Sequence, residues 1–468
     1  HPKPSYLFAL VAGNLASVQD SFITASGRKV DLGIYVEPGK EDMCSWAMDS
    51  LKRSMTWDEQ TFGLEYDLDV FNIVAVSDFN MGAMENKGLN IFNDKYVLAD
   101  PETATDQDYA HVEAVIAHEY FHNWTGNRIT CRDWFQLCLK EGLTVFRDQE
   151  FSSDMRSRPV KRIADVRLLK SHQFPEDAGP LAHPVRPRAY REINNFYTAT
   201  VYEKGAEVVR MLKTLLGETD FRHGMELYIR RHDGDAATIE QFLACFAAVS
   251  DRDLTQFALW YDQSGTPRVE VNLVHDADSG TAALTLTQSL APTPGQDTKQ
   301  PMLIPLRVGF IGDDGAEINL CLREAAHANG DVLLLSERTQ TFTFDGVSSR
   351  PVLSLLRGFS APVILSASQS PADLLFQLRH DRDPFNRWQA AQDLATRELM
   401  RLYAGLLQDQ ALEIDRALVT AFGEVLGNSA LDPAFKAQVL TLPGEADLAR
   451  EIGKDVEPLA ILTARRML

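Results

Sequence analysis

Residues 115–124 of the chain read VIAHEYFHNW, and this stretch contains the pattern His-Glu-x-x-His. On an α-helix four residues turn through about 400°, so His118 and His122 would share one face, roughly 6 Å apart. Two neutral imidazoles at that separation can bind one Zn²⁺ at about 2.0–2.1 Å each. Glu119 lies about 100° round the helix from His118, which places its carboxylate beside the metal. The motif therefore predicts a metal site with a general base next to it.

A third metal ligand must come from another segment, and the obvious candidate is Glu141, which follows His122 with eighteen residues between them. Apolar residues around Glu141 recur at helical spacing, which predicts a second helix that crosses the first. These residues are Trp134, Leu137, Cys138 and Val145. The alternative is that the two histidines are ordinary solvated side chains. His111 lies nearly on the same helix face but about 10.5 Å along the axis, too far away to share the site.

The length and composition indicate a globular protein of several domains. With 468 residues the chain is too long for one ordinary core, so we expect two to four domains. The formal net charge of −20 argues against nucleic acid and membrane surfaces as partners. Five cysteines without a Cys-x-x-Cys pair indicate a reducing compartment, and no apolar run reaches the ~18 residues of a membrane span. We expect a cytoplasmic monomer.

Both ends of the sequence read as cut points. The chain starts at His1 without an initiator Met and runs directly into the strand-like residues 6–12. Its last residues, 459–468, read as a helix interrupted before any cap. We therefore expect this chain to be part of a longer one.

The region before the motif predicts alternating strands and one helix. Strands are expected at 29–36, 69–76 and 88–92, a helix at 42–62, and a helix N-cap at Thr103. Between the last two strands, residues 80–86 read NMGAMEN. Gly82 and Ala83 leave the backbone open to close approach by a ligand, and Glu85 adds a carboxylate. Taken alone, this segment is better explained as a solvated polar loop.

Three elements together carry a family resemblance: Gly-Ala-Met-Glu-Asn at 82–86, His-Glu-Tyr-Phe-His at 118–122, and Glu141. In this combination the sequence resembles the bacterial branch of the zinc aminopeptidase N (alanyl aminopeptidase) family of gluzincin metallopeptidases. The segments at 123–128 and 140–146 are similar to that branch too, and the similarity runs through essentially the whole chain. The resemblance implies a zinc enzyme of the alanyl aminopeptidase type, with one Zn²⁺ per chain. Its substrates would be peptides with a free N-terminus.

The resemblance also implies roles for individual residues in the reaction. His118, His122 and Glu141 correspond to the zinc ligands, and Glu119 corresponds to the general base. Tyr202 corresponds to the hydroxyl that stabilises the tetrahedral intermediate.

The sequence itself offers three tyrosines for that last role. A phenol in the first turn of the amphipathic helix through 209–216 can project into a cleft and donate to an oxyanion. The residues alone do not choose among Tyr190, Tyr197 and Tyr202, and only the resemblance favours Tyr202.

A substrate-binding segment is implied in the same way. It comprises Met81, Gly82, Ala83, Met84, Glu85 and Asn86. In the family, Glu85 would bind the α-amine, the backbone at Gly82 and Ala83 would hold the peptide extended, and Met81 would form a wall of the first side-chain pocket. The family completes the amine site with a second glutamate from a preceding β-rich domain, of which only the tail is recognisable here.

We expect a multidomain α+β protein with four segments. Residues 1–13 would be the tail of an N-terminal β domain, and 14–264 a thermolysin-like zinc catalytic domain. Short alternating strands with Gly/Pro turns predict a small β-sandwich at 265–367. Helical periodicity then predicts the start of an α-helical solenoid at 368–468.

Two other functions share the metal motif. A thermolysin-like endopeptidase must accept chain on both sides of the cleaved bond, so an amine-binding Glu85 would obstruct it. A structural zinc site is normally closed by four protein ligands, and no fourth is apparent. We therefore favour an exopeptidase, and the family implies broad specificity that includes Ala, Arg, Lys and Leu.

Overall fold

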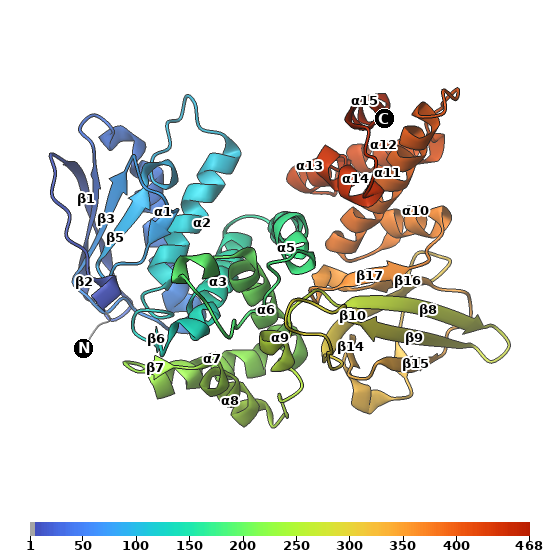
Figure 1. The fold of residues 1–468 in the computed structure, drawn as a ribbon, viewed down its shortest axis with the longest axis horizontal. Helices are drawn as coiled ribbons and strands as arrows, with labels where there is room; N and C mark the ends of the chain where they lie inside the picture. The colour runs from blue at the N-terminus through green and yellow to red at the C-terminus, as the bar shows by residue number, and fades with distance from the viewer. Residues whose placement is uncertain (1–4) are drawn as a thin grey trace. The chain divides into compact units, whose positions relative to one another are not determined.

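A computed structural model describes residues 5–468, which divide into two compact units (Figure 1). Unit 1 contains residues up to Arg158 together with His183–Ser264, and unit 2 contains Pro159–Ala182 and Gly265–Leu468. Residues 1–4 of the predicted N-terminal tail lie outside the described part of the chain. The four-segment division of the sequence remains our proposal for the domain boundaries.

Unit 1 is built on a five-stranded mixed sheet with the strand order β1-β2-β3-β5-β4. The strands are β1 (Ala16–Ile23), β2 (Lys29–Val36), β3 (Val70–Val76), β4 (Ala83–Met84) and β5 (Leu89–Asn93). The inner strands β2, β3 and β5 run parallel, and the outer strands β1 and β4 are antiparallel to their neighbours. Strand β4, formed by the Gly-Ala-Met-Glu-Asn segment, is therefore an edge strand.

Helices α1 (Ser45–Phe62) and α2 (Asp106–Phe121) share one apolar core with this sheet. Trp57 of α1 packs on Phe121 of α2 with ring centroids 5.1 Å apart. The N-cap predicted at Thr103 is wrong by two residues. Thr105 caps α2 instead, because Asp108 completes a reciprocal capping box with it.

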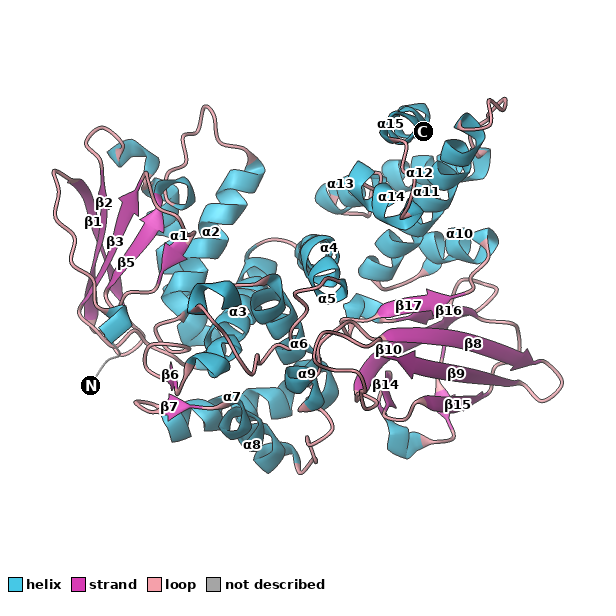
Figure 2. Ribbon diagram, in the orientation of Figure 1, coloured by secondary structure: helices cyan, strands magenta, loops and turns pink. Residues whose placement is uncertain are grey.

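Helix α3 lies at the centre of the rest of unit 1, and it buries every residue from Leu137 to Ser153. The helices of this region are α3 (Leu137–Met155), α6 (Gly205–Leu216), α7 (Glu218–His232), α8 (Ile239–Ser250) and α9 (Leu259–Asp262). The small strands β6 (Thr130–Cys131) and β7 (Ala236–Ala237) pair with each other. Helices α2 and α6 pack against α3 (Figure 2).

The strand predicted at residues 6–12 is wrong. This segment begins with a 3₁₀ turn, η1 (Ser5–Leu7), and continues without regular structure. Leu7 is buried, whereas Phe8 is 78% exposed and Leu10 is 85% exposed. The segment is apolar but pairs with no strand, and apolar character alone cannot distinguish a strand from such a segment.

Unit 2 contains a β-sandwich, as predicted. One sheet has the order β11-β10-β14-β13 with β16 beside β10, and the other has the order β12-β15-β9-β8-β17. The strands are β8 (Arg268–Asp276), β9 (Thr281–Ser289), β10 (Ile304–Ile311), β11 (Glu317–Ile318), β12 (Cys321–Leu322), β13 (Ala328–Asn329), β14 (Val332–Leu335), β15 (Thr339–Asp345), β16 (Val352–Leu355) and β17 (Ile364–Ala367). Phe310 and Phe344, one from each sheet, meet edge-on at 4.9 Å between ring centroids, so the two sheets share a core.

The predicted C-terminal helices are present as well. Unit 2 contains α4 (Arg158–Leu168, of which the first residue belongs to unit 1), α5 (Phe174–Ala178), α10 (Pro371–His380), α11 (Pro384–Leu406), α12 (Arg416–Gly427), α13 (Pro433–Leu440), α14 (Glu445–Ile452) and α15 (Pro458–Met467).

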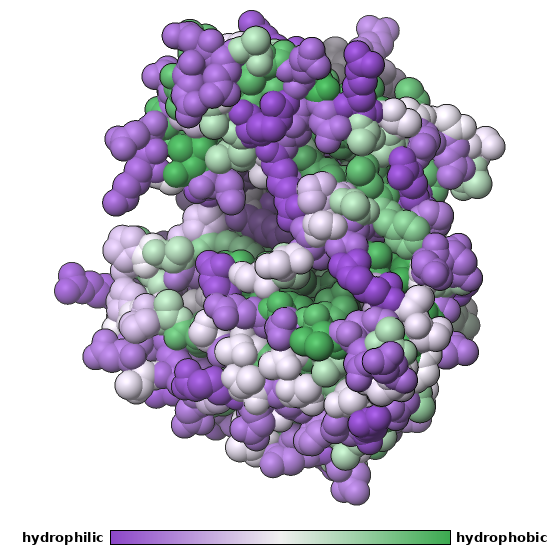
Figure 3. Space-filling model, turned by 90° about the vertical axis from the view of Figure 1, so that its right-hand side faces the viewer, coloured by the Kyte–Doolittle hydropathy of each residue, from purple (hydrophilic) through white to green (hydrophobic). Residues whose placement is uncertain are grey.

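Hydrophilic side chains cover much of the face in Figure 3, with apolar side chains between them. From residue 5 to the C-terminus, no helix combines the length and apolar character needed to cross a membrane.

Candidate metal centre

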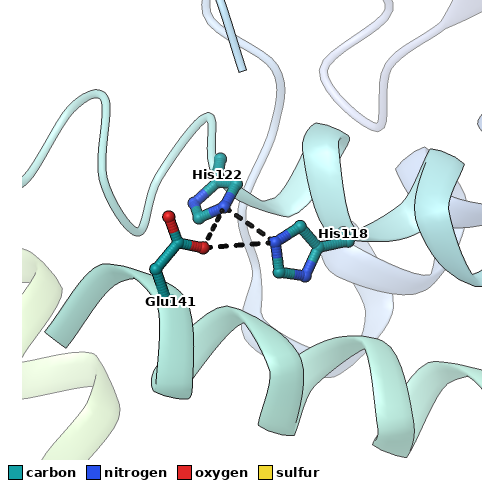
Figure 4. A group of neighbouring side chains, drawn as sticks. All are labelled: His118, His122 and Glu141. Carbon is teal, nitrogen blue, oxygen red and sulfur yellow. Dashed lines mark hydrogen bonds and ion pairs between the residues drawn. The ribbon is translucent and has the colours of Figure 1, made fainter. Parts of the chain in front are cut away.

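His118, His122 and Glu141 converge on one point between α2 and α3 (Figure 4). The two imidazole Nε2 atoms are 3.0 Å apart, and Glu141 Oε2 lies 3.4 Å from Nε2 of His118 and 3.2 Å from Nε2 of His122. Donor atoms of a tetrahedral site with bonds of about 2.1 Å lie roughly 3.4 Å apart. The spacing of these three atoms therefore fits one small metal ion.

The Nδ1 atom of each imidazole makes a hydrogen bond, so the Nε2 atom of each ring is available to a metal. Nδ1 of His118 lies 2.8 Å from Asp148 Oδ2, and Nδ1 of His122 lies 2.9 Å from the carbonyl oxygen of Thr125. Since both partners only accept, each Nδ1 carries a proton, and each ring in its neutral form has its lone pair on Nε2. Glu141 Oε2 is buried and has no hydrogen-bond donor. Three donor atoms of this kind that face one another favour a cation between them.

The pKa values of the two histidines shift in opposite directions. Burial and the nearby Lys140 ammonium lower the pKa of His122 below its ordinary value, which keeps that ring neutral. Burial would also lower the pKa of His118, but the carboxylates of Asp148 and Glu141 beside its ring outweigh burial and raise it well above the ordinary value. The position between these side chains favours positive charge.

One face of α3 supplies most of the support for the site. Thr144 and Asp148 follow Glu141 by three and seven residues, so all three project from the same side of the helix. Thr144 Oγ1 lies 3.2 Å from His122 Nδ1 and 2.7 Å from Thr125 Oγ1. Partners of this kind orient metal ligands, and their loss typically weakens metal binding by about 10–100-fold.

Glu119 stands beside the three donors and is not one of them. Its side chain is buried, and its Oε2 has no hydrogen-bond partner. Burial raises the pKa of Glu119 to about 8, and the neighbouring carboxylates of Glu85 and Glu141 act in the same direction. A carboxylate with a pKa near neutrality is suited to accept and return a proton.

Lys140 links the predicted metal ligand with the predicted amine-binding residue. Its ammonium bonds both Glu85 Oε1 and Glu141 Oε1, and all three side chains are buried. Burial would lower the pKa of Lys140, but the two carboxylates hold it well above its ordinary value. Burial would raise the pKa of Glu85, but Lys140 lowers it, so this carboxylate is ionised. No role for Lys140 was predicted from the sequence.

The predicted substrate-binding segment lies at the edge of the sheet. Ala83 and Met84 of β4 pair with Phe92 and Ile91 of β5, and nothing follows β4 on its other side in the sheet order of the described chain. Glu85 and Asn86 are buried, whereas Met81 is 44% exposed. Oxygens of Glu85 and Glu119 lie within 4.8 Å of a ring nitrogen of His122, so this end of the segment reaches the metal centre.

The structure distinguishes among the three candidate tyrosines. The Tyr202 ring stacks on His118, with centroids 6.4 Å apart and planes 14° apart. The ring centroid of Tyr197 lies 6.1 Å from that of Tyr202. Tyr190 is 43% exposed and packs on Phe135 and Phe196 instead. Burial and then Glu141 raise the pKa of Tyr202 well above its ordinary value, so its hydroxyl keeps the proton.

A glycine contact sets the distance between Tyr202 and the metal ligands. Tyr202 belongs to a π-helical turn, η7 (Thr200–Lys204), which continues into α6. There Gly205 lies against Gly142, the residue after Glu141. A Cβ atom on Gly142 would come within 2.8 Å of the Gly205 Cα. Such π turns are often found at functional sites, and this one is held close to α3 by two residues without side chains.

We expect Gly142→Ala to lower the free energy of unfolding by about 1–3 kcal/mol, because the added methyl group forces α3 and α6 apart. Gly423→Ala is the matched control, since Gly423 also lies within a helix but faces open space. That substitution should stabilise by about 0.5–1 kcal/mol. Urea unfolding followed by circular dichroism measures both, and a neutral Gly142→Ala would show that the contact is not tight.

Asp148, Thr144 and Thr125 were missed by the sequence analysis, as was Lys140. The helical spacing of Asp148 and Thr144 from Glu141 is visible in the sequence and could have identified them. The role of Thr125 rests on its backbone carbonyl, which leaves no signal in residue types.

Family models match the chain in three consecutive parts. Residues 46–261 match the peptidase family M1 domain. Residues 265–368 match a domain of unknown function with an Ig-like fold, and residues 371–468 match a domain of unknown function with ARM repeats.

Similar proteins agree with this assignment. The chain is 56% identical over 464 residues to an aminopeptidase N of Caulobacter vibrioides and 52% identical over 467 residues to one of Escherichia coli. These alignments cover 99% and 100% of this chain but 52% and 53% of the relatives, so the chain spans about half of their length. A crystal structure of Legionella pneumophila aminopeptidase A in complex with aspartic acid matches with a TM-score of 0.85 and 32% identity. That match covers 99% of this chain and 51% of the Legionella chain.

Proposed function

Because this chain belongs to the aminopeptidase N branch of peptidase family M1, we propose that it carries the catalytic centre of a zinc aminopeptidase. The reaction is hydrolysis of the first peptide bond of peptides with a free N-terminus. The observation that carries the proposal is the group of three facing donor atoms, with the buried carboxylate of Glu119 beside it, whose Oε2 has no hydrogen-bond partner.

His118, His122 and Glu141 would hold one Zn²⁺, with Asp148 and Thr125 orienting the two imidazoles. When bound, zinc supplies Lewis acidity, which polarises the scissile carbonyl and lowers the pKa of a water molecule. Two imidazoles and one carboxylate form a ligand set that catalytic zinc sites use. The five cysteines are free, which supports a cytoplasmic location as part of this proposal.

Glu85 would anchor the substrate by its α-ammonium, which places the first peptide bond at the metal centre. An extended peptide could add to the free edge of β4 by backbone hydrogen bonds. Lys140 already bonds one oxygen of Glu85, so the substrate ammonium would share this carboxylate with a cation of the protein. Met81, exposed at the start of the segment, would contact the first side chain of the substrate.

Glu119 would take the proton from the attacking water and deliver it to the leaving amine. Its raised pKa suits both halves of this task, because the group must be a base first and an acid afterwards. Tyr202 would donate a hydrogen bond to the oxyanion that develops on the former carbonyl oxygen. Hydrolysis of a panel of aminoacyl chromogenic amides, with and without a chelator, tests the proposal. Chelator-resistant hydrolysis, or no hydrolysis with zinc loaded, would contradict it.

Tyr202→Phe should lower kcat by roughly 10²–10³-fold, the usual loss for one oxyanion donor. KM should change much less, because the donor acts mainly in the transition state. The matched control is Tyr197→Phe, which removes a hydroxyl from the neighbouring ring and should keep most of kcat. A reversed result, in which only the Tyr197 variant loses kcat, would transfer the role to Tyr197.

A further inference from the structure

A fully buried ion pair joins α1 to α3. Arg147 of α3 and Asp58 of α1 are both 0% exposed, and the Arg147 guanidinium bonds the Asp58 carboxylate. From its contacts we infer that Arg147, held in place by Asp58, is a positioning residue for the metal ligand His122. The inference rests on the proposed zinc site.

The guanidinium of Arg147 reaches past Asp58 to the end of α2. Its Nη1 donates to the carbonyl oxygen of Phe121 at 2.9 Å and to Thr125 Oγ1 at 3.1 Å. Phe121 is the last residue of α2, and its carbonyl oxygen also accepts from the backbone N–H groups of Trp124 and Thr125. The carbonyl end of a helix attracts positive charge. The Phe121 ring also lies 4.7 Å from the guanidinium carbon. Arg147 therefore bonds both ends of the turn between Phe121 and Thr125, which Thr125 also closes through its own N–H and hydroxyl bonds to the Phe121 carbonyl oxygen.

His122 lies inside that turn and depends on it for its orientation. The residue follows the last turn of α2, so the helix holds it only from the N-terminal side. Its ring is fixed by the bond from Nδ1 to the carbonyl oxygen of Thr125. If Thr125 shifts relative to Phe121, this carbonyl moves and the Nε2 lone pair turns away from His118 and Glu141. Arg147 opposes that shift, since Phe121 and Thr125 are two of its three acceptors.

The properties of arginine suit this role. Its planar guanidinium bonds three acceptors at fixed angles, which the ammonium of a lysine cannot reproduce. Asp58 supplies the opposite charge that a buried guanidinium requires. A salt bridge that merely held α1 and α3 together would have no need to bond the turn that contains a metal ligand.

The test measures zinc affinity, by competition with a chromogenic chelator, in variants of the whole chain. The double variant Asp58→Ala/Arg147→Met removes both charges, so it leaves no buried charge unpaired and should fold. We expect its zinc dissociation constant to rise by about 10–100-fold. Arg147→Lys, which keeps the charge beside Asp58, should raise the constant by about 5–10-fold through its lost hydrogen bonds. The visible spectrum of the Co²⁺ form should change in both variants.

Glu113→Gln is the matched control. Glu113 of α2 is buried and pairs with Arg53 of α1 and with Arg156 at the end of α3, so it joins the same three helices away from the metal. This variant should lower the melting temperature and leave zinc affinity and the Co²⁺ spectrum unchanged. A general loss of packing would affect both sites alike, whereas a positioning role affects only the Arg147 variants.

Wild-type zinc affinity in both Arg147 variants would overturn the inference, and so would an equal loss of affinity in Glu113→Gln. Failure of the proposed function gives a different result. In that case the wild-type chain would bind no stoichiometric zinc, or would bind it equally well after His122→Ala.

Discussion

Glu119→Gln is expected to lower kcat by about 10²–10⁴-fold while the zinc content stays at one ion per chain. The loss is that of a general base, because glutamine has the same shape but cannot accept a proton at neutral pH. The zinc content should stay because Glu119 is not among the three converging donors. Metal analysis and hydrolysis of an aminoacyl amide on the same preparation measure both quantities.

The ligand variants provide the control for this experiment. His118→Ala or Glu141→Ala removes one of three protein donors and should release the zinc, so that activity and metal are lost together. The assignment would be overturned if the Glu119 variant lost its zinc and the His118 variant retained it.

Glu85→Gln should lower kcat/KM for peptides with a free N-terminus by roughly 30- to 4,000-fold. This range corresponds to about 2–5 kcal/mol for removing one partner of a buried charge pair. Glu85 is buried and Lys140 holds its pKa below the ordinary value, so it presents a negative charge to the substrate ammonium.

An N-acetylated copy of the same peptide is the matched control substrate. The wild-type enzyme should cleave it very poorly, because the Glu85 carboxylate is desolvated and has only Lys140, and no substrate ammonium, to pair with. The variant should narrow the gap between the free and the acetylated peptide. Equal rates on both forms by the wild type, or cleavage at internal bonds, would favour an endopeptidase instead.

The sequence was sufficient for the parts of the site that depend on helical spacing. His118 and His122 could be placed on one face from their separation alone, and the apolar period around Glu141 predicted the helix that supplies the third donor. Helices and strands with strong periodicity, such as α1 and β2, were predicted to within a few residues for the same reason. The sandwich followed from its short strands and turns.

Contacts between distant segments could not be predicted. Nothing in residues 140–141 shows that the Lys140 ammonium bonds Glu85, because that pairing depends on how β4 and α3 meet. The Thr125 carbonyl belongs to the backbone, and the pattern of residue types does not specify it. The apolar run at 6–12 was mistaken for a strand because the sequence does not show whether a pairing neighbour exists.

Helix α3 has no solvent-exposed face along most of its length, and this limits which changes of chain length it can tolerate. Inserting or deleting one residue near its start would rotate everything downstream by about 100° and move it by about 1.5 Å. The change would separate four residues from their partners at the same time: Glu141, Thr144, Arg147 and Asp148. It would also move polar side chains into apolar surroundings. A point substitution in α3 changes one contact, whereas the insertion or deletion of a single residue near its start would disrupt all of these contacts at once. Homologous enzymes should therefore vary in length in the loops around α3 and not within it.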